Sequence, residues 1–116
     1  MIDPADCHTM TELRAGIDAL DAELVALLRL RARFIDRAAE IKASVGLPAR
    51  LEDRVEEVVA NVRRHAESQG LDAALAEQLW RGLIEWSIAR EEGHMGPDAR
   101  RTALSDDPIS ALQQKI

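Results

Sequence analysis

One apolar pattern constrains the fold more than any other feature, because it runs from Thr9 to Ser44 without a proline. Thr9 or Thr11 can cap a helix at its start, and the sequence Ser-Val-Gly-Leu-Pro at 44–48 ends it. Its members recur in alternating steps of four and three, the spacing that lines one face of a helix. This inner line is Leu13, Ile17, Leu20, Leu24, Leu27, Arg31, Phe34, Ala38 and Ile41. The pattern predicts one long helix.

A second helical pattern begins near Ala49 or Arg50 and ends at Gly70, a residue type that often terminates helices. Acidic residues in its first turn suit the positive end of the helix dipole. One face is apolar, and we expect that face to be buried. Its members are Leu51, Val55, Val58, Val59 and Val62.

A third helical pattern is capped by Asp72 and closes between Gly93 and Gly96. The chain has no Tyr and one Phe, a composition that favours helices over sheets, so we predict the all-α class with three helices. The inner line of the third helix is Ala76, Trp80, Leu83, Ser87 and Glu91, with Leu75, Leu79 and Trp86 widening the apolar stripe.

We expect residues 1–96 to form one helical domain and residues 97–116 to form a flexible tail. The stretch 98–107 is polar and charged, with too little apolar content to order itself. Pro108 can start a short helix over residues 108–114.

The length of the first helix predicts a dimer. A helix from Thr9 to Ser44 is about 50 Å long, whereas a compact globule of this chain length has a radius of gyration of only ~13 Å. One copy cannot cover such an apolar stripe, so we predict an intertwined homodimer with antiparallel long helices. An open coiled coil is the alternative, but it would leave the two shorter helices without a partner surface.

Charge and cysteine content limit the partners and the compartment. The net charge is -6 and the basic residues are spread along the chain, which disfavours nucleic acid and anionic membranes as partners. No apolar run approaches the ~20 residues that span a bilayer. Cys7 is the only cysteine, and the acidic N-terminus lacks signal-peptide features, so we expect a cytoplasmic protein.

No metal or cofactor is expected. His8, His65 and His94 have no metal-ligand spacing to one another or to Cys7. The sequence also contains no glycine-rich phosphate loop.

Two cations lie on or near the inner line of the first helix: Arg31 is a member of the line, and Lys42 lies next to its last member. Arg31 is a member of that line, where a guanidinium is costly to bury unless an anion meets it. Lys42 lies eleven residues further on, which is three turns and only ~20° of rotation. Ala38 lies between them and leaves room. This arrangement favours a bound anion.

A structural role is the alternative for both cations. Arg31 would then pair with a core carboxylate such as Asp21 or Glu91, and Lys42 would extend from the helix end into solvent.

On the third helix, Ser87 and Glu91 stand four residues apart and should both point inward. A carboxylate in a water-poor site tends to have a raised pKa, so it can stay protonated and donate a hydrogen bond. The alternative for Glu91 is an ordinary ion pair with Arg90 or exposure to solvent.

Two further arginines are candidates for binding an anion. Arg14 lies seventeen residues before Arg31, about 25 Å away along the helix. It cannot share a small-molecule site with Arg31 in its own subunit, but an antiparallel partner would bring the other copy's Arg14 close. Arg54, near the start of the second helix, is the other candidate, with a solvated surface role as the alternative.

This ordered set of residues resembles the all-helical chorismate mutase family, which includes isochorismate pyruvate lyases and aminodeoxychorismate mutases. The likeness covers about residues 6 to 92. It consists of Arg14, Arg31 and Lys42 on one long helix, Arg54 on a short helix, and Ser87-x-x-x-Glu91 on a third.

The resemblance implies a homodimer that binds a small dicarboxylate, with two identical sites and no cofactor. Arg31, together with Arg14 from the other subunit, would clamp the substrate's carboxylates. Lys42 and Glu91 would donate hydrogen bonds to the ether oxygen of the enolpyruvyl group, and Ser87 would help to position the ring. The implied reaction is the Claisen rearrangement of chorismate to prephenate.

The sequence departs from the mutase pattern at several positions. Val55 is apolar where many mutases carry an acidic group on the ring hydroxyl, and Leu51 stands where a mutase may have Asp. These residues and the opening Asp-Pro-Ala-Asp-Cys at 3–7 resemble lyases, whereas Ser87 and Glu91 resemble mutases. We predict a chorismate mutase. The alternatives are an isochorismate pyruvate lyase giving salicylate and pyruvate, and a non-catalytic helical dimerisation module.

Overall fold

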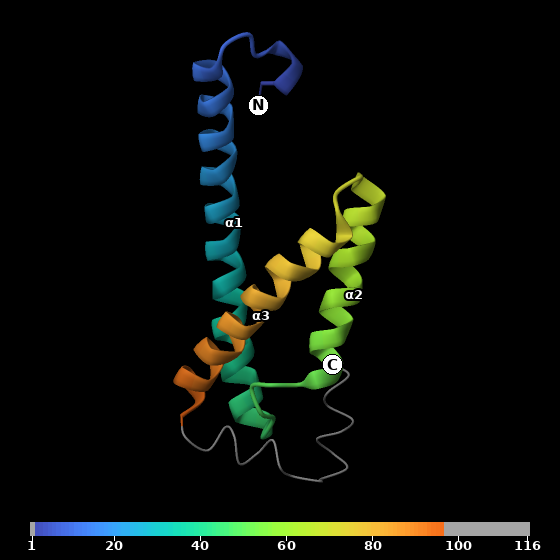
Figure 1. Cartoon of the computed structure of the whole chain (residues 1–116). Helices are drawn as coiled ribbons and strands as arrows, with labels where there is room; N and C mark the ends of the chain where they lie inside the picture. The colour runs from blue at the N-terminus through green and yellow to red at the C-terminus, as the bar shows by residue number, and fades with distance from the viewer. Residues whose placement is uncertain (1, 97–116) are drawn as a thin grey trace. The chain divides into compact units, whose positions relative to one another are not determined.

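The computed structural model describes residues 2–96, and all regular structure among them is helical (Figure 1). A short 3₁₀ helix, η1 (Pro4–Asp6), precedes α1 (Met10–Val45), α2 (Glu52–Gln69) and α3 (Ala73–Met95). The predicted all-α class and the long first helix are confirmed. The tail predicted for 97–116, with its possible short helix, lies outside the described residues. The chain divides into two parts, residues 1–34 and residues 35–116.

The start of α1 is fixed by a local cap. The backbone N–H of Glu12 donates to Oγ1 of Thr9 at 3.1 Å, and that hydroxyl donates to the Glu12 carboxylate at 3.1 Å. Thr9 is therefore the cap, rather than Thr11. Upstream, the side chain of Asp3 accepts a 2.8 Å hydrogen bond from Ala5 N at the start of η1, a short element that we did not predict.

The first part of the chain leaves its large apolar side chains uncovered. Among residues 2–34, no residue is buried, although the inner line of α1 predicts a core-facing stripe. Phe34 is 69% exposed and Leu27 is 62% exposed. Others exposed in this part are Met10, Ile17, Leu20, Leu24, Val25, Leu28 and Leu30.

The second part begins within α1 and turns sharply at Gly46. This glycine has φ 78°, a left-handed conformation, and the N–H of Leu47 donates to Lys42 O at 2.9 Å across the turn. The predicted helix end is confirmed. The predicted start of the next helix at Ala49 or Arg50 is wrong, because Leu51 is extended (φ -121°, ψ 101°) and α2 begins at Glu52.

Helices α2 and α3 form a hairpin around a small apolar core. Gly70, with φ 75°, ends α2, and Asp72 caps α3 by accepting a 2.9 Å hydrogen bond from Ala74 N, as predicted. Helix α3 continues past Gly93 and ends at Gly96. The buried cluster consists of Ala49, Val55, Val59, Ile84 and Ile88, with Val58, Trp80 and Met95 packed against it.

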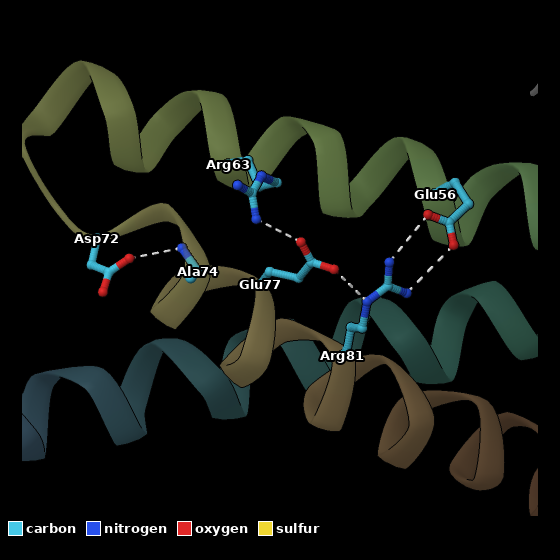
Figure 2. A network of polar contacts seen from close by, with 6 residues as sticks. All are labelled: Glu56, Arg63, Asp72, Ala74, Glu77 and Arg81. Carbon is cyan, nitrogen blue, oxygen red and sulfur yellow. Dashed lines mark hydrogen bonds and ion pairs between the residues drawn. The ribbon is translucent and has the colours of Figure 1, made fainter.

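Ion pairs join α2 to α3 along the surface of the hairpin (Figure 2). The carboxylate of Glu77 on α3 accepts from Arg63 on α2 at 2.6 Å and from Arg81 at 2.7 Å. Arg81 also reaches Glu56 on α2 with two contacts of 3.4 and 3.3 Å. Hydrogen bonds from Arg81 first, and then from Arg63, lower the pKa of Glu77.

A further pair ties the loop before α2 to α3. Arg50 contacts both carboxylate oxygens of Glu85, one of them at 3.0 Å. The hydrogen bond from Arg50 lowers the pKa of the Glu85 carboxyl. This pair and the network around Glu77 thus connect two regions of α3 to α2 and to the loop before it.

Within residues 2–96, one face of α3 remains exposed. Leu75, Leu79 and Trp86 are 42%, 56% and 50% exposed, whereas the predicted widening of the apolar stripe would bury them. Across residues 2–96, no helix combines the length and apolar content required to span a membrane.

Candidate functional site

A lysine and a glutamate from different helices meet in a nearly dry position. Nζ of Lys42, in the last turn of α1, lies 2.7 Å from Oε1 of Glu91 on α3. The Lys42 side chain is 17% exposed and that of Glu91 is 5% exposed. Because a charge is costly to remove from water, each of these groups requires the other, or a ligand, as a partner.

The turn after α1 provides a second partner for the lysine. Lys42 Nζ donates to Ala49 O at 2.7 Å. The turn at Gly46 sends the chain back along the end of α1, and Leu47, Pro48 and Ala49 are all buried there. An ammonium group has three N–H donors. The contact with Ala49 uses one of them, and the Glu91 carboxylate lies beside the ammonium as its ion-pair partner.

Ser87 lies one turn before Glu91 on α3. Both residues are buried, at 3% and 4% exposure, as expected for their places on the inner line. The Ser87 hydroxyl donates to Leu83 O at 2.8 Å within the helix.

Arg54 lies in the first turn of α2, as predicted, and is exposed. Its guanidinium is 2.5 Å from Oε1 of Glu57, three residues further along the same helix. This contact is a surface pair of the kind that contributes little to stability. A role for Arg54 in binding an anion stays a prediction.

The other two predicted site residues belong to the first part of the chain. Arg14 is exposed and Arg31 is half-buried. Their convergence with Lys42 and Glu91 stays a prediction.

A second charged cluster between α1 and α3 escaped sequence reasoning. Arg90 donates to Asp36 through Nε to Oδ1 at 2.6 Å and through Nη2 to Oδ2 at 3.0 Å. His94 Nε2 lies 3.3 Å from Oδ1 of the same carboxylate. The guanidinium also lies 5.4 Å from the centroid of the Trp86 ring, within range of a cation–π contact.

The hydrogen bond from Arg90 is the main cause of the lowered pKa of Asp36. The ion-pair partner of Arg90 is therefore Asp36. We had considered Glu91 as an alternative partner of Arg90, and that contact is not the one observed. No sequence signal points to this partnership, because the two residues are 54 positions apart. Within residues 2–96, no group of three or more His, Cys, Asp or Glu side chains is placed to hold a metal ion.

The described residues thus define an all-helical protein with a buried lysine–glutamate pair at the junction of its first and third helices. Residues 13–92 match the family described as chorismate mutase type II. The chain belongs to this enzyme family, which confirms the resemblance inferred from its residue pattern. It is also 35% identical over 88 residues to an isochorismate pyruvate lyase of Pseudomonas aeruginosa, an alignment that covers 76% of this chain and 86% of that protein.

Proposed function

We propose that this chain is a chorismate mutase, which converts chorismate to prephenate. In this reaction the ether C–O bond breaks while a C–C bond forms between the enolpyruvyl methylene and the ring. No proton moves and no atom is lost, so neither a nucleophile nor a cofactor is needed. Catalysis depends on holding the substrate folded and on stabilising the negative charge that gathers on the ether oxygen.

The observation that carries the proposal is the buried contact of Lys42 with Glu91. An oxygen about 3 Å from both groups would accept a hydrogen bond from the ammonium of Lys42. A full positive charge in a site with little water stabilises a developing anion far more than it would in bulk water. Lys42 is therefore the main catalytic residue of the proposed mechanism.

Glu91 has two functions in this mechanism. Without substrate it is the partner of the Lys42 ammonium, at 2.7 Å. With substrate bound, it donates a hydrogen bond to the same oxygen, which requires a proton on the carboxyl. An ionised Glu91 would repel the developing charge and slow the reaction.

The remaining roles require a second copy of the chain. Arg31, together with Arg14 of the partner copy, would bind the two substrate carboxylates as bidentate clamps. A homodimer is supported by the apolar side chains that remain exposed on residues 10–34 and on α3, including Leu27, Phe34 and Leu79. A stripe of this kind marks an interaction surface. Ser87 would help to position the ring.

Isochorismate pyruvate lyase activity is the second candidate, and two observations favour it. The Pseudomonas aeruginosa relative carries that name, and Val55 and Leu51 are both apolar and 8% exposed. Neither can bind a ring hydroxyl. In the lyase reaction a ring hydrogen transfers to the enolpyruvyl methylene as the ether bond breaks, releasing salicylate and pyruvate. Lys42 would stabilise the ether oxygen there as well.

Separate incubation with each substrate tests the proposal. Purified protein is mixed with chorismate or with isochorismate, and prephenate or salicylate is quantified, with Lys42→Met as the inactive control. We expect prephenate from chorismate. Salicylate alone would replace the mutase proposal with the lyase, and no product from either substrate would reject both.

A further inference from the structure

Two ion pairs, close to each other along α3, connect the last turns of α1 to α3. Asp36 pairs with Arg90, and Lys42 pairs with Glu91. The partners on α1 are six residues apart, about 9 Å along the axis, whereas the partners on α3 are consecutive. Between the two residues of α1 lies Ala39, which is 1% exposed and so small that α3 can approach the helix there.

The buried apolar cluster of the hairpin does not extend to α1. The buried cluster of the hairpin takes its members from α2, α3 and the loop before α2, and none from α1. Ala39 is the one buried residue of α1. The two ion pairs therefore add a restraint between the end of α1 and α3 that this cluster does not provide.

The two pairs restrain α3 from different directions. Consecutive residues of a helix point about 100° apart, so the side chains of Arg90 and Glu91 leave α3 on different sides. One contact alone would allow α3 to rotate about it, and two such contacts prevent that rotation. Arg90 is itself held in place, because its guanidinium lies on the ring of Trp86 and binds Asp36 through two hydrogen bonds.

We infer that Asp36 and Arg90 are positioning residues: their ion pair holds α3 at the rotation that places Glu91 against Lys42. This inference rests on the proposed function for its effect on turnover. Neither residue needs to touch the substrate, because a misplacement of about 1 Å in a catalytic group can cost up to a hundredfold in rate.

The first test is steady-state kinetics on Asp36→Asn, Arg90→Gln and the double variant. We expect kcat to fall about tenfold in each single variant, with KM within about twofold of wild type, and the double variant to be no slower than either single one. Arg90→Lys, which keeps the charge, should recover part of the loss. The matched control is Arg37→Ala, which breaks the pair Arg37–Glu40, at 2.6 Å and within the same stretch of α1.

The second test does not depend on turnover. The exchange of the Lys42 ammonium protons with water, measured by NMR, should be slow in wild type and faster by several-fold in Asp36→Asn and Arg90→Gln, but not in Arg37→Ala. If both variants keep wild-type kcat and wild-type exchange well below their melting temperatures, the pair is only a structural contact and the inference is overturned. If wild type converts neither substrate, the proposed function fails, and the exchange comparison still decides whether the pair positions Lys42.

Discussion

The ammonium of Lys42 and the carboxylate of Glu91 lie 2.7 Å apart, in a position from which both side chains are largely shielded from water. A buried pair of this kind is often no more stabilising than apolar residues of the same size, because both charges lose their hydration. Under the proposed function, the pair has a chemical task that offsets this cost.

Removing the cation should destabilise the fold. Lys42→Met leaves Glu91 without its ammonium partner, and we expect the free energy of unfolding to fall by about 3 kcal/mol, as for other buried pairs that lose one member. Lys42→Met combined with Glu91→Gln should recover part of this loss, because the second change removes the stranded charge. Urea unfolding measures both effects. A wild-type midpoint for Lys42→Met would show that the pair is not effectively buried.

Turnover should fall as the pH rises through the range in which Glu91 loses its proton in the substrate complex. The reason is that only the protonated carboxyl donates to the ether oxygen. Glu91→Gln carries an amide donor at every pH, so its kcat should be flatter with pH. A pH profile of kcat for the two proteins checks this, and a flat wild-type profile would remove protonated Glu91 from the mechanism.

Because of the ion-pair network in Figure 2, the stability of the fold should decrease at acidic pH. The folded pKa of Glu77 is lowered below its ordinary 4.5 by Arg81 and Arg63. The contribution of the Glu77 carboxylate to the stability of the fold is therefore complete above about pH 4.5. It is lost as the pH falls through the folded pKa of Glu77. Glu77→Gln should lower the Tm by a few degrees at pH 7 and much less at pH 3, as followed by circular dichroism. Glu67→Gln, an exposed change on α2, serves as the control and should show no such difference.

Arg31→Ala should remove activity without unfolding the protein. Because a clamp on a carboxylate contributes through charge and two hydrogen bonds, we expect kcat/KM to fall by about a hundredfold or more. Arg33→Ala, at an exposed position two residues away on α1, is the control. A fully active Arg31→Ala variant with a wild-type circular dichroism spectrum would exclude Arg31 from the site.

Much of the fold could be predicted because its signals are local. Thr9 with Glu12, the glycine at 46, and Asp72 at the start of α3 each specify a helix end through neighbouring residues. The start of α2 was predicted too early for a reason that is not local. Ala49 O accepts from Lys42 and Arg50 binds Glu85, so both residues are held outside the helix by distant partners.

The site could be predicted only in outline. The spacing of Ser87 and Glu91 placed both on the inner face of α3, and both are buried. Their partners depend on how the helices meet, and the spacing of charges does not specify that. Only the resemblance to the family brought Lys42 and Glu91 together, and the pairing of Asp36 with Arg90 was visible only in three dimensions.

Mixing two inactive variants tests most directly whether a site is shared between two chains. Arg14→Ala and Lys42→Met should each be nearly inactive as homodimers. After the two are unfolded together and refolded in equal amounts, about half of the dimers are hybrids, and each hybrid has one intact site. We therefore predict roughly a quarter of the wild-type rate. No recovery in a mixture shown to contain hybrids, or full activity of a monomeric protein, would contradict the account.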